Sequence, residues 1–130
     1  MEKFIKFLKY WLPVILWAGG IFYLSSISGL ASDMSVFWDV FWRKLAHATE
    51  FGILNLLLFR ALWGYKMKTS QAIILSFILS VLYAFSDELH QYFVPNRECR
   101  LKDVGMDSLG AAAMTAVIYL LNRLKFIVQK

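Results

Sequence analysis

Four long apolar segments, each about the length of a membrane span, dominate this chain. A bilayer core ~30 Å thick requires about 20 apolar residues in a helix, and lipid-exposed backbone must be hydrogen-bonded internally. Charged residues are 18% of the chain and gather between the segments, whereas a soluble domain needs more charge to cover its surface. The sequence therefore predicts an all-α polytopic membrane protein, one domain over residues 1–130, with spans at about 10–27, 44–63, 70–94 and 103–121.

The basic residues predict how the helices are oriented. One side of the membrane would hold both termini and the second connection, with nine Lys and Arg, and the other side would hold five. An excess of Lys and Arg marks the cytoplasmic side, so we expect both termini in the cytoplasm. The net charge of +5 does not indicate nucleic acid, because the cations stand at the ends of apolar segments. Aromatic residues in the first connection, residues 28–41, predict a segment at the membrane interface.

Ionisable residues occur inside three of the four segments. On the second, Lys44, His47 and Glu50 follow at a spacing of three, which places them on one helix face. The third carries Asp87 and Gln91 at i,i+4, with Glu88 and His90 beside them, and the fourth carries Asp103 and Asp107 at i,i+4. At 1.5 Å per residue, Glu50 and Asp87 lie roughly 10 Å inside the outer boundary and Asp107 about 6 Å. The three helices thus deliver polar groups to one layer.

Such groups are costly in lipid and are functional candidates by default. The simpler alternative is that they hold the helices together, at about 1 kcal/mol per hydrogen bond. Holding helices together would explain one buried polar residue. It is a poorer explanation for several carboxylates and two histidines that converge at one depth. We therefore predict a functional pocket open to the outer leaflet.

Several chemistries suit these residues. His47 beside Glu50 is typical of a general base oriented by a carboxylate, and we assign catalytic roles to His47, Glu50, Asp87, Glu88, Gln91 and Asp107. A divalent metal is a weaker hypothesis, since no short ligand motif is present, and the cofactor stays unknown. Guanidinium groups bind phosphate or carboxylate in bidentate fashion, so we assign head-group binding to Lys44, Arg97, Arg100 and Asp103. Pairing of the two arginines with Glu98 and Asp103 and interfacial placement of Lys44 are the structural alternatives.

The ordered motifs resemble the VanZ-like family. They are Lys44-x-x-His47-x-x-Glu50-Phe51, then Asp87-Glu88-x-x-Gln91-x-Phe-x-Pro95-Asn96-Arg97, then Lys102-Asp103-Val104-x-x-Asp107-x-x-Gly110, and together they cover nearly the whole chain. Glycine is usual in the family where Asn96 stands, and Tyr where Phe51 stands. Asn tolerates the left-handed turn that glycine favours, so we expect the loop to be kept.

The resemblance implies a small protein of the bacterial cytoplasmic membrane. The namesake of the family is associated with resistance to the glycopeptide teicoplanin. It implies no reaction. We therefore expect a cell-envelope protein that binds or processes an amphiphile with a phosphate, sugar or peptide head group, with membrane lipid or a lipoglycopeptide as ligand. The alternative is a non-catalytic lipid-binding, antibiotic-binding or partner subunit. A proton-coupled transporter is a weaker third hypothesis, because the inner half lacks acidic groups for a relay.

Overall fold

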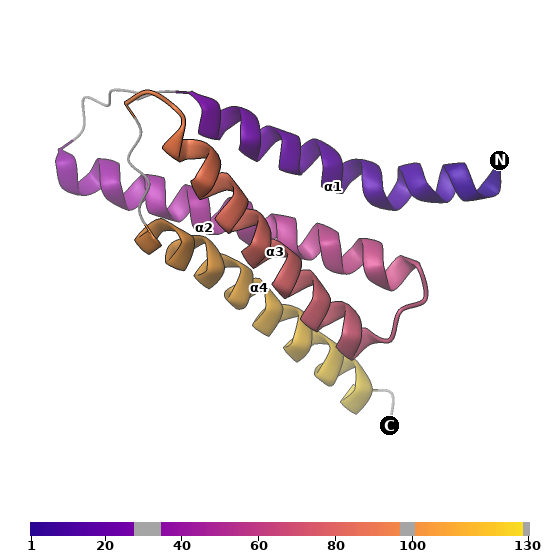
Figure 1. The fold of residues 1–130 in the computed structure, drawn as a ribbon. Coiled ribbons are helices and arrows are strands. Elements are labelled where there is room, and N and C mark those ends of the chain that lie inside the picture. The colour runs from indigo at the N-terminus through magenta and orange to yellow at the C-terminus, as the bar shows by residue number, and fades with distance from the viewer. Residues whose placement is uncertain (28–34, 97–100, 129–130) are drawn as a thin grey trace.

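The computed structural model is a bundle of four helices (Figure 1). It describes residues 1–27, 35–96 and 101–128. The helices are α1 (Glu2–Ser26), α2 (Val36–Gly64), α3 (Thr69–Tyr92) and α4 (Leu101–Val128). Each of the four in this described part of the chain is long and apolar enough to cross a membrane, which confirms the predicted all-α transmembrane architecture. The orientation of the termini stays a prediction.

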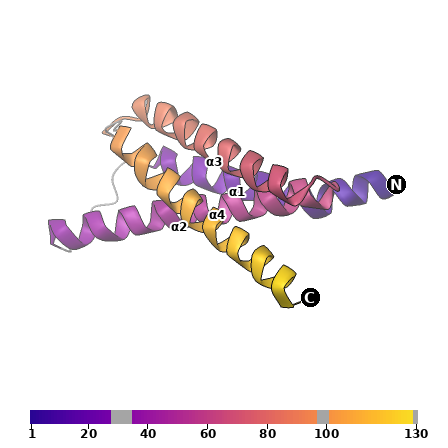
Figure 2. The same cartoon turned by 90° about the horizontal axis from the view of Figure 1, so that it is seen from below.

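The helices differ from the predicted spans at their ends, most of all at α2. This helix begins at Val36 and not near residue 44, so residues 36–41 of the expected connection are helical. Contacts along the helix accompany the added turns: Asp39 and Arg43 form an i,i+4 ion pair at 2.9 Å, and aromatic rings meet edge to face between Trp38 and Phe41. Pairs at i,i+3 and i,i+4 stabilise a helix of this kind. These first turns project beyond the other three helices (Figures 1 and 2).

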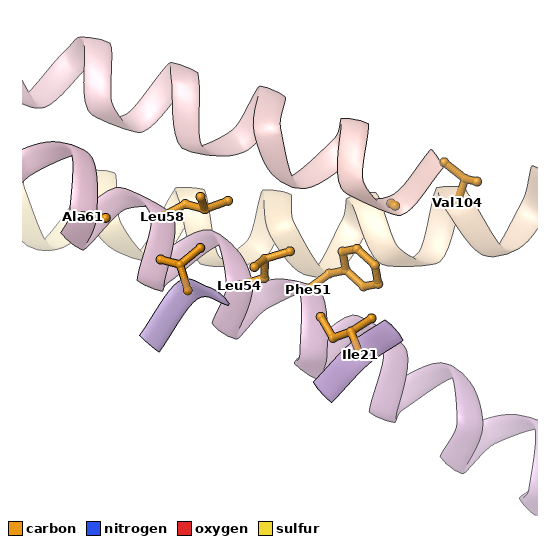
Figure 3. Close-up of a cluster of buried hydrophobic side chains, with 8 residues drawn as sticks. Ile21, Phe51, Leu54, Leu58, Ala61 and Val104 are labelled. Carbon is orange, nitrogen blue, oxygen red and sulfur yellow. The ribbon is translucent and has the colours of Figure 1, made fainter. Parts of the chain in front are cut away.

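Helix α2 makes the most extensive contacts in the bundle, against all three other helices. Its covered face carries Phe51, Leu54 and Leu58 at helical spacing, all buried. Ile21 of α1 joins the same cluster, beside Phe51 (Figure 3). Large apolar side chains elsewhere on the described helices are exposed, as expected of surfaces that face lipid.

The closest helix crossing joins α2 and α4. A side chain on Gly110 of α4 would overlap the backbone carbonyl of Ala48 on α2. A Cβ on Gly52 would lie 3.3 Å from the carbonyl oxygen of Gly110. Small residues allow helix backbones to approach this closely in lipid, where packing drives association. The glycines therefore set how near α4 comes to the middle of α2.

The bundle has two chemically different ends. At one end lie the start of α1, the end of α4 and the turn between α2 and α3 (Figure 1). That turn contains Lys66, whose φ of 64° is left-handed and stops α2, a role more often taken by glycine. The opposite end holds the last turn of α1, the end of α3 and the start of α4 (Figure 1). The buried Asp87, Glu88, Gln91 and Asp107 belong to the parts of α3 and α4 nearer this end.

Candidate functional site

Buried polar side chains from α3 and α4 form the core of the candidate site. Asp87, Glu88 and Gln91 of α3 are 3%, 3% and 4% exposed, and Asp107 of α4 is 1% exposed. His47 and Glu50 of α2 are half-buried. Carboxylates are almost never this buried in proteins unless they are paired. The six residues that the sequence assigned to catalysis are thus all fully or partly removed from the surface.

His47 and Asp107 form the contact between α2 and α4 within the site. The Nδ1 atom of His47 lies 3.3 Å from Oδ1 of Asp107. The distance is that of an ion pair, and the ring is not aligned for a well-directed hydrogen bond. Asp107 has the strongest electrostatic effect on His47, followed by Glu50 and Asp87.

This contact changes the expected partner of the imidazole. The sequence predicted Glu50 as the carboxylate beside His47, whereas Asp107 makes the close approach. The physical reason is the glycine crossing: Gly110 brings the backbone of α4 against Ala48, one residue after His47. Glu50 remains near enough to act on His47 electrostatically.

Gln91 joins α3 to α1 at the site. Its Nε2 donates to Oδ2 of Asp87 at 3.0 Å, which is the i,i+4 pair expected from the spacing. It also lies 3.4 Å from Oγ of Ser25 on α1. The other oxygen of Asp87, Oδ1, is buried and has no hydrogen-bond partner. One half of this carboxylate is therefore satisfied and the other is not.

His90 faces away from this arrangement, toward α1. Its Nε2 lies 2.9 Å from Oγ of Ser26, and its ring stacks on Phe22 with centroids 4.1 Å apart. These contacts give His90 a structural role in holding α1 on α3. No three imidazole, thiolate or carboxylate groups in the described part of the chain come together in a way that could hold a metal ion, so the metal hypothesis gains no support there.

The residues assigned to head-group binding are less well gathered. Lys44 is exposed on α2, between the groove-lining Trp42 and Leu45. Asp103 is half-buried and acts electrostatically on Asp107, one turn along α4. Arg97 and Arg100 lie outside the described residues.

An open groove of about 360 Å³ lies beside the site, between α1 and α2. Most of its lining is apolar or aromatic, and Glu50 and Thr49 are its polar members; the others are Trp17, Trp42, Leu45, Ala46 and Ile53. The indole N–H of Trp17 donates to the backbone carbonyl of Glu50 at 2.9 Å, which fixes one wall of the groove. We call this feature the Trp17 groove.

The sequence profile of the VanZ/LLP1 family matches residues 7–122 of the chain. The chain belongs to this family. No curated protein and no solved structure shows significant similarity to it. The matched region contains the VanZ-like motif residues on α2, α3 and α4, and the structure brings His47, Asp87 and Asp107 of those motifs close enough to act on one another electrostatically. Asn96 has the left-handed φ, 62°, that was expected at this position.

One polar residue in the middle of this VanZ/LLP1 chain was missed from the sequence. Asn55 of α2 is fully buried, and its Nδ2 donates to the carbonyl of Ala111 at 2.9 Å and to Oγ1 of Thr115 at 2.8 Å. Its Oδ1 has no hydrogen-bond partner. The signal was present, because Asn55 lies two helical turns after His47 inside an apolar run and so shares its face.

Proposed function

We propose that this protein resides in the bacterial cytoplasmic membrane and binds or processes an amphiphile at the cell envelope. The head group, a phosphate, sugar or peptide, would enter the polar site, and the hydrocarbon chain would lie in the Trp17 groove. Both termini would be cytoplasmic, so that the site opens toward the outer leaflet.

The observation that carries this proposal is the buried carboxylate of Asp87, which lies among groups from α2 and α4 and has one oxygen unsatisfied. Burying a charge in an apolar bundle costs several kcal/mol unless it is paired. The cost is reasonable when the group serves a ligand. A groove with an apolar lining and one carboxylate suits a molecule that is itself half apolar.

Mass spectrometry of the lipids that co-purify with the protein tests this proposal. We expect wild type to retain a defined amphiphile and Arg97→Ala to retain less, because that change removes an anion contact. Asp39→Asn is the matched control, since Asp39 belongs to the projecting part of α2 and pairs with Arg43. Wild type that holds no amphiphile above the detergent background, or Asp39→Asn that loses as much as Arg97→Ala, would contradict the proposal.

A catalytic version of the same site is the second candidate, favoured by the approach of Asp107 to His47. A carboxylate behind an imidazole orients a general base, and Glu50 or Asp87 would be the acid. The amide variants Glu50→Gln and Asp87→Asn separate the two candidates. A catalytic site predicts that both variants retain the amphiphile and lose the envelope phenotype, whereas a binding protein predicts that phenotype follows retention.

The envelope phenotype to measure is susceptibility to teicoplanin, a lipid-tailed glycopeptide that fits the proposed ligand class. We propose that overproduction of wild type lowers susceptibility. Amide variants that bind and protect like wild type would show that the carboxylates are structural.

A further inference from the structure

The unsatisfied oxygen of Asp87 identifies the kind of group that the site is built to receive. Asp87 is 3% exposed; its Oδ2 accepts the hydrogen bond from Gln91, and its Oδ1 is buried without a partner. A carboxylate oxygen is purely an acceptor. Leaving one unsatisfied inside a protein costs about 1–3 kcal/mol, and more when it is charged. The missing partner is therefore a hydrogen-bond donor.

No donor on the described helices makes a hydrogen bond to Oδ1 of Asp87. The hydroxyl of Tyr83, which Asp87 influences electrostatically, donates to the carbonyl of Ala18 at 2.6 Å. Gln91 uses its amide on Oδ2 of Asp87 and lies near Ser25. Nδ1 of His47 faces Asp107. A donor for Oδ1 must then come from outside these side chains.

Charge narrows the identity of this donor. Asp87 and Asp107 act electrostatically on each other and on the imidazole of His47, whose Nδ1 lies 3.3 Å from Oδ1 of Asp107. Among the described residues, these two carboxylates around one imidazole attract a cation more than a neutral hydroxyl. A bare phosphate would instead bring acceptor oxygens and negative charge toward acceptors of the same sign.

The Trp17 groove is where such a group would enter from the lipid. Its lining includes Glu50, which also acts electrostatically on His47, the residue that faces Asp107. The hydroxyl of Thr49 donates to its own helix at the carbonyl of Leu45. The rest of the lining offers apolar surface to a hydrocarbon chain.

We infer that the bound amphiphile carries a primary ammonium group, which donates to Oδ1 of Asp87 while its chain lies in the Trp17 groove. This inference rests on the proposed function and selects, among its head groups, those with a free amine, such as an amino sugar or a peptide. Charge-assisted hydrogen bonds of this kind are short and strong, and they reject analogues that lack the N–H.

Quenching of tryptophan fluorescence by brominated lipids tests the inference. The full chain is placed in phosphatidylcholine vesicles with a small fraction of phospholipid brominated in its chains. Phosphatidylethanolamine offers the ammonium, phosphatidylcholine keeps the positive charge without N–H donors, and phosphatidylglycerol offers hydroxyls without the cation. Trp17→Phe and Trp42→Phe identify the part of the quenching that arises in the groove.

We expect brominated phosphatidylethanolamine to quench the tryptophan fluorescence of the groove at about one tenth of the mole fraction that the other two probes need. A tenfold difference corresponds to the free energy of one charge-assisted hydrogen bond. Asp87→Asn should abolish this preference, because its amide can turn an N–H toward the ligand. Quenching by the choline probe should stay unchanged. Asp39→Asn, the control, should keep the preference. The comparison of probes in wild type stands even if Asp87→Asn fails to fold.

Three results would each overturn the inference. They are equal quenching by the three probes, stronger quenching by the glycerol probe, and a preference for phosphatidylethanolamine that survives in folded Asp87→Asn. In that case water satisfies Oδ1. If mass spectrometry finds a retained amphiphile while the probes are equal, the proposed function stands and the ammonium assignment fails. If no amphiphile is retained and the tryptophan fluorescence of the groove is not quenched, the proposed function and the ammonium assignment both fail.

Discussion

At the scale of single residues, the site depends on how deeply each charge is buried more than on the distance between partners. The Asp39–Arg43 pair is shorter, at 2.9 Å, but the arginine side chain is 56% exposed. The His47–Asp107 pair is 3.3 Å long, and the aspartate side chain is 1% exposed. Water and ions screen the first pair, whereas low dielectric surroundings strengthen the second.

A double-mutant cycle on His47→Gln and Asp107→Asn should therefore give a coupling energy of about 0.5–3 kcal/mol. The same cycle on Arg43→Gln and Asp39→Asn should give about 0.3–0.5 kcal/mol, the value of an exposed i,i+4 pair. Unfolding of the purified protein in mixed micelles measures both. A coupling at the exposed pair that equals or exceeds the buried one would show that burial does not control these contacts.

Residue-scale contacts within one helix were predictable, and those between helices were not. Spacing alone predicts the bond between Gln91 and Asp87, because i,i+4 residues share a face. The left-handed Asn96 follows from the conformational range of asparagine. The approach of Asp107 to His47 depends on how far α4 comes toward α2, and a list of spacings does not contain that distance.

At the scale of helices, the crossing of α2 and α4 determines that distance. Gly110 leaves no room for a Cβ against Ala48, whereas a Cβ on Gly105, in the same helix, would meet no atom within 4 Å. Glycine and alanine are frequent in α4, and small residues favour close helix packing in lipid. Which glycine makes the contact is visible in the structure alone.

Gly110→Ala should destabilise the protein by about 1–3 kcal/mol, because the helices must separate to admit the new methyl group. The matched variant Gly105→Ala should be neutral or stabilise by up to about 1 kcal/mol, through the higher helix propensity of alanine. Thermal unfolding of the two variants in the same detergent compares them. Equal effects would mean that the crossing is loose enough to adapt.

Helix ends were predicted less well than helix number. The start of α2 at Val36 was missed, because hydropathy ends a span at the first charges, whereas backbone hydrogen bonds continue past them. Lys44 therefore lies inside α2 and not at its start, and its side chain is exposed. Its side chain is long enough to reach the lipid head groups from there.

At the scale of the whole molecule, the site lies toward one end of the bundle, so its function depends on which side of the membrane that end faces. Among the described residues, the buried carboxylates all lie toward the end where α3 finishes and α4 starts. The count of basic residues predicts that this end is outside.

Cysteine accessibility in intact cells tests this orientation. In a Cys99→Ser background, we expect Asn96→Cys to react with a membrane-impermeant maleimide and Lys66→Cys to react after the cells are opened. Both positions lie in turns with a positive φ, which makes them a matched pair. Labelling of Lys66→Cys in intact cells would place the site on the cytoplasmic side and remove the outer leaflet as its source of ligand.

The pairing of α2 with α4 also has a consequence for biogenesis. The partners of Asn55 and His47 lie in α4, which leaves the ribosome after α2 and α3. During translation, α2 therefore enters the bilayer with polar side chains whose partners have not yet been made, and each is costly in lipid. Insertion of α4 supplies these partners and covers the polar groups.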